Sequence, residues 1–123
     1  MAEIIPVEDK LRIQAYCLKF DVHFDLSHSA YVAFDKGEAV GMCVFQLQND
    51  ECDIRSLTFS EEISDTPIPI LLLRAIVHFA DRCGISRIIA RDSEISMSIA
   101  AQAGFAPDED DCRIYYYKRY IDR

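Results

Sequence analysis

The residues best placed for binding chemistry lie in the segment SDTPIPI, whose last residue begins the apolar run ILLLRAIV. A helix that begins in this segment leaves its first backbone N–H groups unpaired, and such a helix start attracts anions. Thr66, Ile68 and Ile70 can supply donors of this kind, whereas Pro67 and Pro69 carry no N–H. The segment therefore predicts an anion site at a helix start, but one with fewer backbone N–H donors than a helix start without prolines would offer.

Acidic side chains stand close to the same segment, at Glu61, Glu62 and Asp65. They add negative charge where an anion would bind. A lost hydrogen bond to a charged group costs about 1.5–3 kcal/mol, or about ten- to a hundredfold in affinity. Because proline suits the first turn of a helix, TPIP predicts a good helix start and a poor phosphate cradle.

Other side chains capable of chemistry stand alone in the sequence. His23, His28 and His78 have no partner in a motif, so each is expected to be structural or exposed. The five cysteines lack C-x-x-C pairs, which argues against a zinc site and a disulfide framework and predicts reduced core residues. The acidic run at 108–111 lacks the glycine and the distal glutamate of a calcium loop. No metal site is predicted.

The element that positions the proline segment is a helix predicted over Ile68–Cys83, which Gly84 can end. The helix is apolar on more than one face, so it is expected to be largely buried. A strand is predicted before it and another after it, at Arg87–Ala90. Strand, loop, helix and strand in this order indicate a parallel crossover.

The remaining elements can be read from apolar spacing and turn residues. Gly37 favours a tight hairpin, and Cys52–Phe59 alternates, with Cys52, Ile54, Ser56 and Thr58 expected on one face. The other predicted elements are an edge strand at Glu3–Val7, a helix from about Glu8 to Phe20, hairpin strands at Tyr31–Phe34 and Ala39–Leu47, a helix at Ser93–Gln102 and a strand at 113–120. The predicted fold class is α/β (α+β), with a mixed, twisted β-sheet and flanking helices.

Composition narrows the functions that remain. The chain has 123 residues, 50% of them hydrophobic, which predicts a single domain over residues 1–123. The formal net charge of −8 argues against a nucleic-acid or anionic-membrane partner. No apolar run reaches the length of a membrane span, and the acidic N-terminus does not resemble a signal peptide. We therefore expect a cytoplasmic protein.

Three stretches resemble the GNAT superfamily of acyl-CoA-dependent N-acetyltransferases. The hairpin YVAFDKGEAVGMCVF contains the pattern D-x-G-x-x-V-G, IRSLTF leads into LLLRAIVHFADRCGISRI, and SIAAQAGFAP looks like the helix that ends in A-G-F in this family. Together they cover residues 31 to about 120. The resemblance implies a GNAT-like fold, acetyl-CoA as the cofactor and an amine as the acyl acceptor.

The resemblance also implies roles for individual residues. The backbone of Leu57 and Phe59 would bind the pantetheine arm, and Asp53 would be the general base. The remaining implied cofactor contacts are Ser64, Asp65, Thr66, Ile68 and Ile70. The pyrophosphate pattern of the family requires Gln or Arg, then two glycine-like positions, but Ser64, Pro67 and Pro69 stand there. Ser93 and Ala100 replace the asparagine and the tyrosine of the C-terminal helix, and alanine carries no proton for the leaving thiolate.

Two functions stay open at this point. In the first, the chain is an enzyme that passes an acyl group from acyl-CoA to an amine, and its acidity favours a cationic acceptor such as a polyamine, an aminoglycoside or a basic N-terminus. In the second, the fold is kept but the cofactor site has decayed. The chain would then be an interaction or regulatory module that does not bind CoA, and a homodimer is one form it could take.

Overall fold

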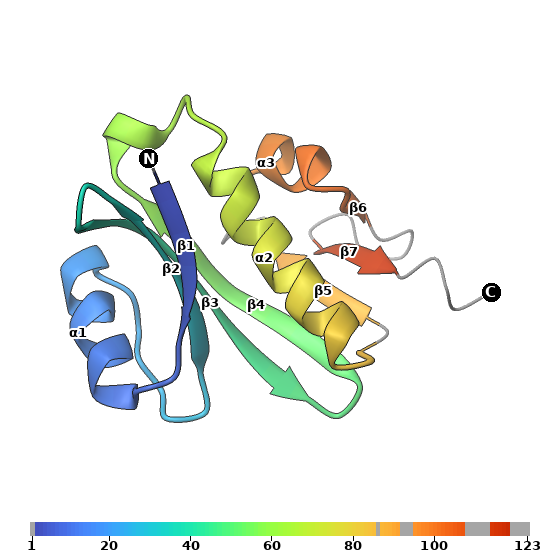
Figure 1. Ribbon diagram of the computed structural model, residues 1–123. Coiled ribbons are helices and arrows are strands. Elements are labelled where there is room, and N and C mark those ends of the chain that lie inside the picture. Colours follow the sequence, from blue (N-terminus) through green and yellow to red (C-terminus); the bar gives the residue numbers. More distant parts are fainter. Residues whose placement is uncertain (1, 86, 92–94, 108–113, 119–123) are drawn as a thin grey trace.

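The computed structural model describes residues 2–85, 87–91, 95–107 and 114–118. Within these residues, seven strands form one mixed sheet in the order β1-β2-β3-β4-β5-β7-β6 (Figure 1). The strands are β1 (Ala2–Val7), β2 (Ser29–Asp35), β3 (Glu38–Gln48), β4 (Glu51–Phe59), β5 (Arg87–Arg91), β6 (Ala106–Pro107) and β7 (Ile114–Lys118). The helices are α1 (Lys10–Phe20), the 3₁₀ turn η1 (Glu61–Ile63), α2 (Ile68–Arg82) and α3 (Met97–Gln102). The mixed sheet with flanking helices confirms the predicted fold class.

The first half of the sheet is an antiparallel meander of β2, β3 and β4, as predicted. Its first turn consists of Lys36 and Gly37, with φ of 55° and 81°. Two successive positive φ angles are what a two-residue hairpin turn requires, and glycine adopts one of them without strain. The parallel pairing of β4 with β5 confirms the predicted crossover through α2.

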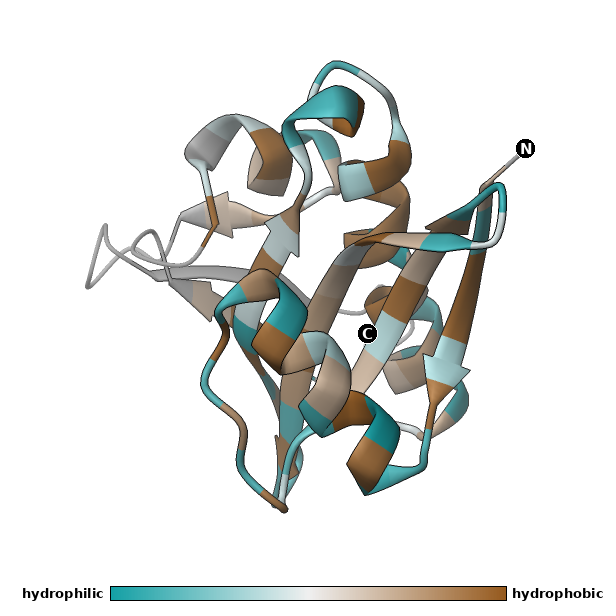
Figure 2. Cartoon of the chain, turned by 90° about the vertical axis from the view of Figure 1, so that its left-hand side faces the viewer, coloured by the Kyte–Doolittle hydropathy of each residue, from teal (hydrophilic) through white to brown (hydrophobic). Residues whose placement is uncertain are grey.

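The two long helices cover opposite faces of the sheet. Figure 1 shows α2 crossing one face and α1 lying on the other. Each helix has its own apolar cluster, since Leu72, Leu73 and Ile76 of α2 belong to one and Ile13 and Cys17 of α1 to the other. In the hydropathy colouring of Figure 2, apolar residues dominate the middle strands while the helices mix apolar and polar residues. The strand β3 is therefore buried on both sides, with seven consecutive buried residues from Ala39 to Phe45.

A bulge in β4 changes which of its side chains face α2. Val44 pairs with Ser56 and Phe45 with Ile54, so Arg55 is an extra residue without a partner on β3. An extra residue reverses the alternation of side chains after it. Ile54 and Leu57 therefore share the apolar cluster under α2. The prediction that Ile54, Ser56 and Thr58 share a face was wrong for this reason.

Two further predictions need correction. The helix predicted from Ser93 begins at Met97, where the Ser96 hydroxyl accepts a hydrogen bond from the Ile99 N–H and caps the helix. Cys83, expected in the core, is exposed, whereas Cys17, Cys43 and Cys52 are buried as predicted. Ser93, Cys112 and the acidic run at 108–111 lie outside the described residues.

Candidate functional site

The strands β4 and β5 separate soon after they meet. Among the described residues they pair at three positions, Glu51 with Arg87, Cys52 with Ile88 and Asp53 with Ile89. Beyond Asp53, residues 54–59 of β4 have no strand partner at this edge in the described part of the chain, and β5 pairs along its whole length with β7 at its other edge. An unpaired strand edge offers backbone N–H and C=O groups to an extended ligand. The implied pantetheine contacts Leu57 and Phe59 both lie on this open stretch.

A cavity of about 340 Å³ lies where the starts of α2 and α3 come together. Four of the residues proposed from the sequence as cofactor contacts line it: Ser64, Asp65, Thr66 and Ile70. The α3 side contributes Ser96, Ser98, Ile99 and Gln102. Ile68 is instead buried in the cluster under α2, at 8% exposure. The structure thus brings most of the predicted segment to one cavity.

The donors at the start of α2 are already used within the chain. The Thr66 hydroxyl donates to the Ile63 carbonyl at 2.7 Å and accepts from the Ile68 N–H at 3.2 Å. The Ser64 hydroxyl donates to the Glu61 carbonyl at 2.8 Å. Of the first-turn N–H groups, that of Ile70 alone has no acceptor among the described residues. One amide beside the exposed Asp65 carboxylate is a poor match for a pyrophosphate, which requires several donors.

Asp53 is the last residue of β4 that pairs with β5, so its carboxylate lies where the strands separate. The Arg55 Nη1 donates to the Asp53 Oδ2 at 3.1 Å, and the Asp53 side chain is 13% exposed. The proposed general base is therefore held by a cation.

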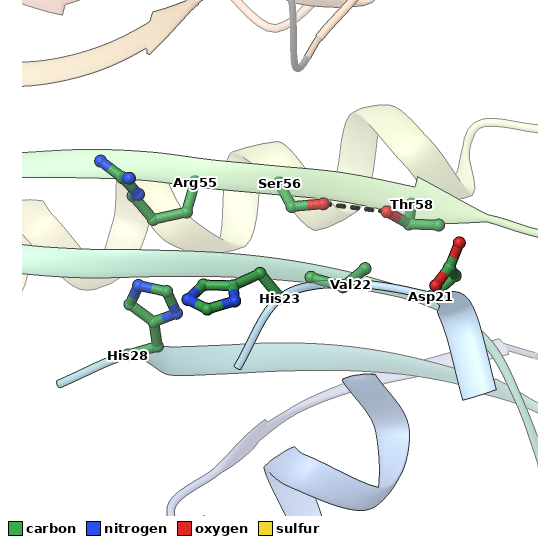
Figure 3. Close-up of a pocket in the computed structure, with 7 residues that line it drawn as sticks. All are labelled: Asp21, Val22, His23, His28, Arg55, Ser56 and Thr58. Atoms are coloured by element: carbon green, nitrogen blue, oxygen red, sulfur yellow. Dashed lines mark hydrogen bonds between the residues drawn. The ribbon is translucent and has the colours of Figure 1, made fainter. Parts of the chain in front are cut away.

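A second cavity, of about 260 Å³, lies on the α1 side of β4 (Figure 3). The connector between α1 and β2 contributes Asp21, Val22, His23 and His28 to it, and β4 contributes Arg55, Ser56 and Thr58. The two imidazole rings lie side by side, with their centroids 6.3 Å apart. Ser56 and Thr58 bond to each other through their hydroxyls, at 2.9 Å.

Sequence reasoning missed this second cavity. It treated His23 and His28 as isolated residues, since nothing in the connector matches a motif. Their proximity to Arg55 depends on the way the connector crosses the sheet, and no local pattern encodes that path.

Within the described part of the chain, no cluster of histidine, cysteine and carboxylate side chains could hold a metal ion. No described helix combines the length and the apolar character needed to span a membrane.

Comparisons with known proteins find similarity in structure and none in sequence. No protein-family model matches the chain, and no curated protein matches its sequence. Among solved structures, an IAA acetyltransferase from Bacillus cereus superposes with a TM-score of 0.71 at 16% identity, over 97% of this chain and all of that one. The ribosomal-protein-S18-alanine N-acetyltransferase from Escherichia coli gives 0.72 at 14% identity, over 96% of this chain and 94% of that one.

A third similar structure was determined with the cofactor bound. It is an acetyltransferase from Bacillus subtilis in complex with CoA, with a TM-score of 0.68 and 17% identity over 97% of this chain and 99% of that one. These likenesses extend over nearly the whole chain. We conclude that the chain has the fold of the GNAT acetyltransferases.

Proposed function

We propose that the chain is an acyltransferase that takes an acyl group from acyl-CoA and passes it to an amine. The observation that carries the proposal is the separation of β4 from β5 after Asp53, beyond which residues 54–59 of β4 have no strand partner at that edge among the described residues. An extended pantetheine arm can bond to such an edge as an added strand would. The GNAT fold and the CoA complex of the Bacillus subtilis acetyltransferase support this assignment.

The two halves of the cofactor fit the chain differently. The backbone of Leu57 and Phe59 would hold the pantetheine arm. The cavity at the start of α2 would meet the pyrophosphate through Ser64, Thr66 and the Ile70 N–H, but Thr66 already caps Ile68 and Pro69 has no N–H. We therefore expect CoA to be bound chiefly through its arm, with a loss of about 3 kcal/mol or more against a glycine-containing loop. Such a loss moves a micromolar site towards millimolar.

Calorimetric titration with acetyl-CoA tests this reading. The natural chain should bind weakly, and the double variant Pro67→Gly, Pro69→Gly should bind at least about a hundredfold more tightly, because glycine restores an N–H at each position. Pro6→Gly in β1 is the matched control, since it removes a proline far from α2 in the sequence. Acyl transfer should then be assayed at millimolar acetyl-CoA with spermidine, kanamycin and a peptide with a basic N-terminus as acceptors.

A second function is favoured by the self-capped start of α2. If neither the natural chain nor the double variant binds acetyl-CoA, the chain is better described as a GNAT-fold interaction or regulatory module, and Glu61, Glu62 and Asp65 are the next residues to replace. Low-micromolar binding by the natural chain would instead exclude the decayed site. For either function, the acidic composition favours the cytoplasm and a partner other than nucleic acid, and sedimentation would decide whether a homodimer forms.

A further inference from the structure

The cavity at the start of α2 contains a carboxylate where a phosphate site needs donors or cations. Asp65 lines this cavity, is exposed, and has no side-chain hydrogen bond or ion pair to any described residue. No basic side chain is among the described residues that line the cavity, and Arg74, one helical turn beyond Ile70, is not one of them. A phosphate group placed here would meet a negative charge that no neighbouring cation offsets.

The backbone of the same segment has few donors left to offset this charge. The N–H groups of Ser64 and Thr66 donate to carbonyls of the turn η1, at 3.1 Å and 3.0 Å. The Ile68 N–H donates to the Thr66 hydroxyl at 3.2 Å. The N–H groups of Asp65 and Ile70 remain without an acceptor among the described residues. The segment therefore offers one carboxylate acceptor and two amide donors.

The α3 side of the cavity adds uncharged polar groups, and Figure 1 shows α3 beside the start of α2. The Ser96 hydroxyl accepts from the Ile99 N–H at 3.2 Å, and the Ser98 hydroxyl accepts from the Gln102 side-chain amide at 3.1 Å. Each serine hydroxyl also has a proton of its own to donate. A lining of one carboxylate and several uncharged donors suits a hydroxyl group, which both donates and accepts.

The cavity follows the stretch of β4 that would hold the pantetheine arm. Phe59 ends β4, and only Ser60 and the turn η1 separate it from Ser64, which lines the cavity. The far end of the arm is a phosphate ester in CoA and a primary hydroxyl in free pantetheine. A hydroxyl can donate to the Asp65 carboxylate and accept from the Ile70 N–H. The phosphodiester of CoA has no proton to donate at pH 7, and its charge repels the carboxylate.

We propose that the acyl donor of this chain is a pantetheine thioester without the nucleotide, and that Asp65 selects the hydroxyl end of the arm over the phosphate of CoA. The inference rests on the acyltransferase function proposed above and concerns its donor. In the transfer, the amine nitrogen bonds to the acyl carbon, and the bond from that carbon to sulfur breaks with its electron pair on sulfur. The sulfur takes up the proton that the nitrogen loses, so that free pantetheine leaves.

The test compares three donors, acetyl-pantetheine, acetyl-4′-phosphopantetheine and acetyl-CoA, with saturating spermidine, kanamycin or the basic peptide as acceptor. For the natural chain, the KM of acetyl-pantetheine should be lower than that of either phosphorylated donor by about tenfold or more, because like charges placed together oppose binding. Raising KCl from about 50 mM to about 500 mM should lower the KM of acetyl-CoA, since salt screens the repulsion, and leave that of acetyl-pantetheine unchanged.

A single substitution tests the part played by Asp65. Asp65→Asn keeps an oxygen that accepts from a hydroxyl but removes the charge, so the KM of acetyl-CoA should fall about tenfold while that of acetyl-pantetheine changes little. Glu8→Gln is the matched control, because it removes the same charge from an exposed residue next to α1, on the face of the sheet opposite α2 (Figure 1). It should leave the preference between the donors as it is.

The outcomes separate this inference from the function on which it rests. If the natural chain transfers from acetyl-CoA with a KM equal to or below that of acetyl-pantetheine, the inference about the donor is overturned and the acyltransferase stands. If Asp65→Asn and Glu8→Gln improve the KM of acetyl-CoA equally, the net charge of the chain sets the preference and the role of Asp65 is overturned. Absence of transfer from all three donors to all three acceptors would overturn both proposals.

Discussion

At the scale of single residues, Gly41 lets α2 approach the sheet. A Cβ placed on Gly41 would meet Leu72 Cδ1 and Phe59 Cβ at 3.1 Å and the Thr58 carbonyl oxygen at 3.3 Å. Each of these contacts is shorter than side chains normally allow, and two of them are with atoms that cannot rotate away. Gly41 is the last glycine of the D-x-G-x-x-V-G pattern, and the close packing of α2 and β4 around it explains why this position has no side chain.

We expect Gly41→Ala to lower the free energy of unfolding by about 1–3 kcal/mol, because overpacking forces α2 or β4 to shift. Urea unfolding followed by circular dichroism measures the change. Leu72→Val shortens the side chain that the new methyl group meets, so the cost of Gly41→Ala should be smaller in that background. Equal costs in the two backgrounds would show that Leu72 is not the group that resists the methyl group.

His28 gives a second prediction at the residue scale, on the pH dependence of stability. Its pKa in the folded chain is lowered, chiefly by burial, from the ordinary value of 6.5. Between the two values the unfolded chain binds more protons than the folded chain, so the stability contributed by a neutral His28 is present above about pH 6.5 and is lost as the pH falls below it. The loss per pH unit for one group cannot exceed about 1.4 kcal/mol.

The free energy of unfolding should therefore fall less steeply below pH 6.5 in His28→Gln than in the natural chain. Urea titrations between pH 5 and 7.5 provide the two slopes. His78→Gln, which removes an exposed histidine of α2, serves as the control for the substitution itself. Identical slopes for the natural chain and His28→Gln would mean that the ring titrates normally in the folded state.

At the scale of elements, the start of α2 is closed by the chain itself. Pro67 precedes the helix without a side-chain cap, Pro69 occupies its second position, and the Thr66 hydroxyl takes over as the acceptor for the Ile68 N–H. We expect Thr66→Ala to lower the free energy of unfolding by about 0.5–2 kcal/mol, the usual cost of a lost cap. The same variant frees the Ile68 N–H, so acetyl-CoA should bind more tightly although the protein is less stable.

Thr66→Ser provides the control for this prediction, since its hydroxyl can still accept from the Ile68 N–H. It should keep most of the stability and the weak affinity of the natural chain. Opposite movement of stability and affinity in Thr66→Ala is the informative result. A variant that loses stability and gains no affinity would show that the Ile68 N–H does not reach the cofactor.

The elements also show how far the sequence leads. The order of strands and helices along the chain, the hairpin at Gly37 and the crossover helix were predictable, because each depends on local periodicity or on one turn residue. The bulge at Arg55 was not, because a strand with one extra residue shows the same alternation as one without it until its partner is known. The residues before α2 line a cavity, but their contact with a cofactor stays a prediction. The proximity of His23 and His28 to Arg55 depends on long-range packing that no motif records.

At the scale of the whole molecule, the cysteines report on how the chain opens. Cys17, Cys43 and Cys52 are buried, and burial raises the pKa of each thiol, that of Cys52 to about 12 with smaller contributions from Asp53 and Cys83. Cys83 at the end of α2 is exposed. Because the thiolate is the reactive form, buried thiols should react only when the fold opens.

We therefore expect one fast and three slow thiol reactions in a Cys112→Ser background, which removes the cysteine that lies outside the described residues. At pH 8 an aromatic disulfide reagent should modify Cys83 at once, and the three buried thiols at least about a thousandfold more slowly, as a stability of 5 kcal/mol or more requires. Adding Cys83→Ser must remove the fast phase.

The natural chain in urea, without reductant and protected from air, should give five free thiols. Fewer than five would reveal a disulfide, and fast reaction of Cys43 or Cys52 would mean that the sheet under α2 opens without global unfolding.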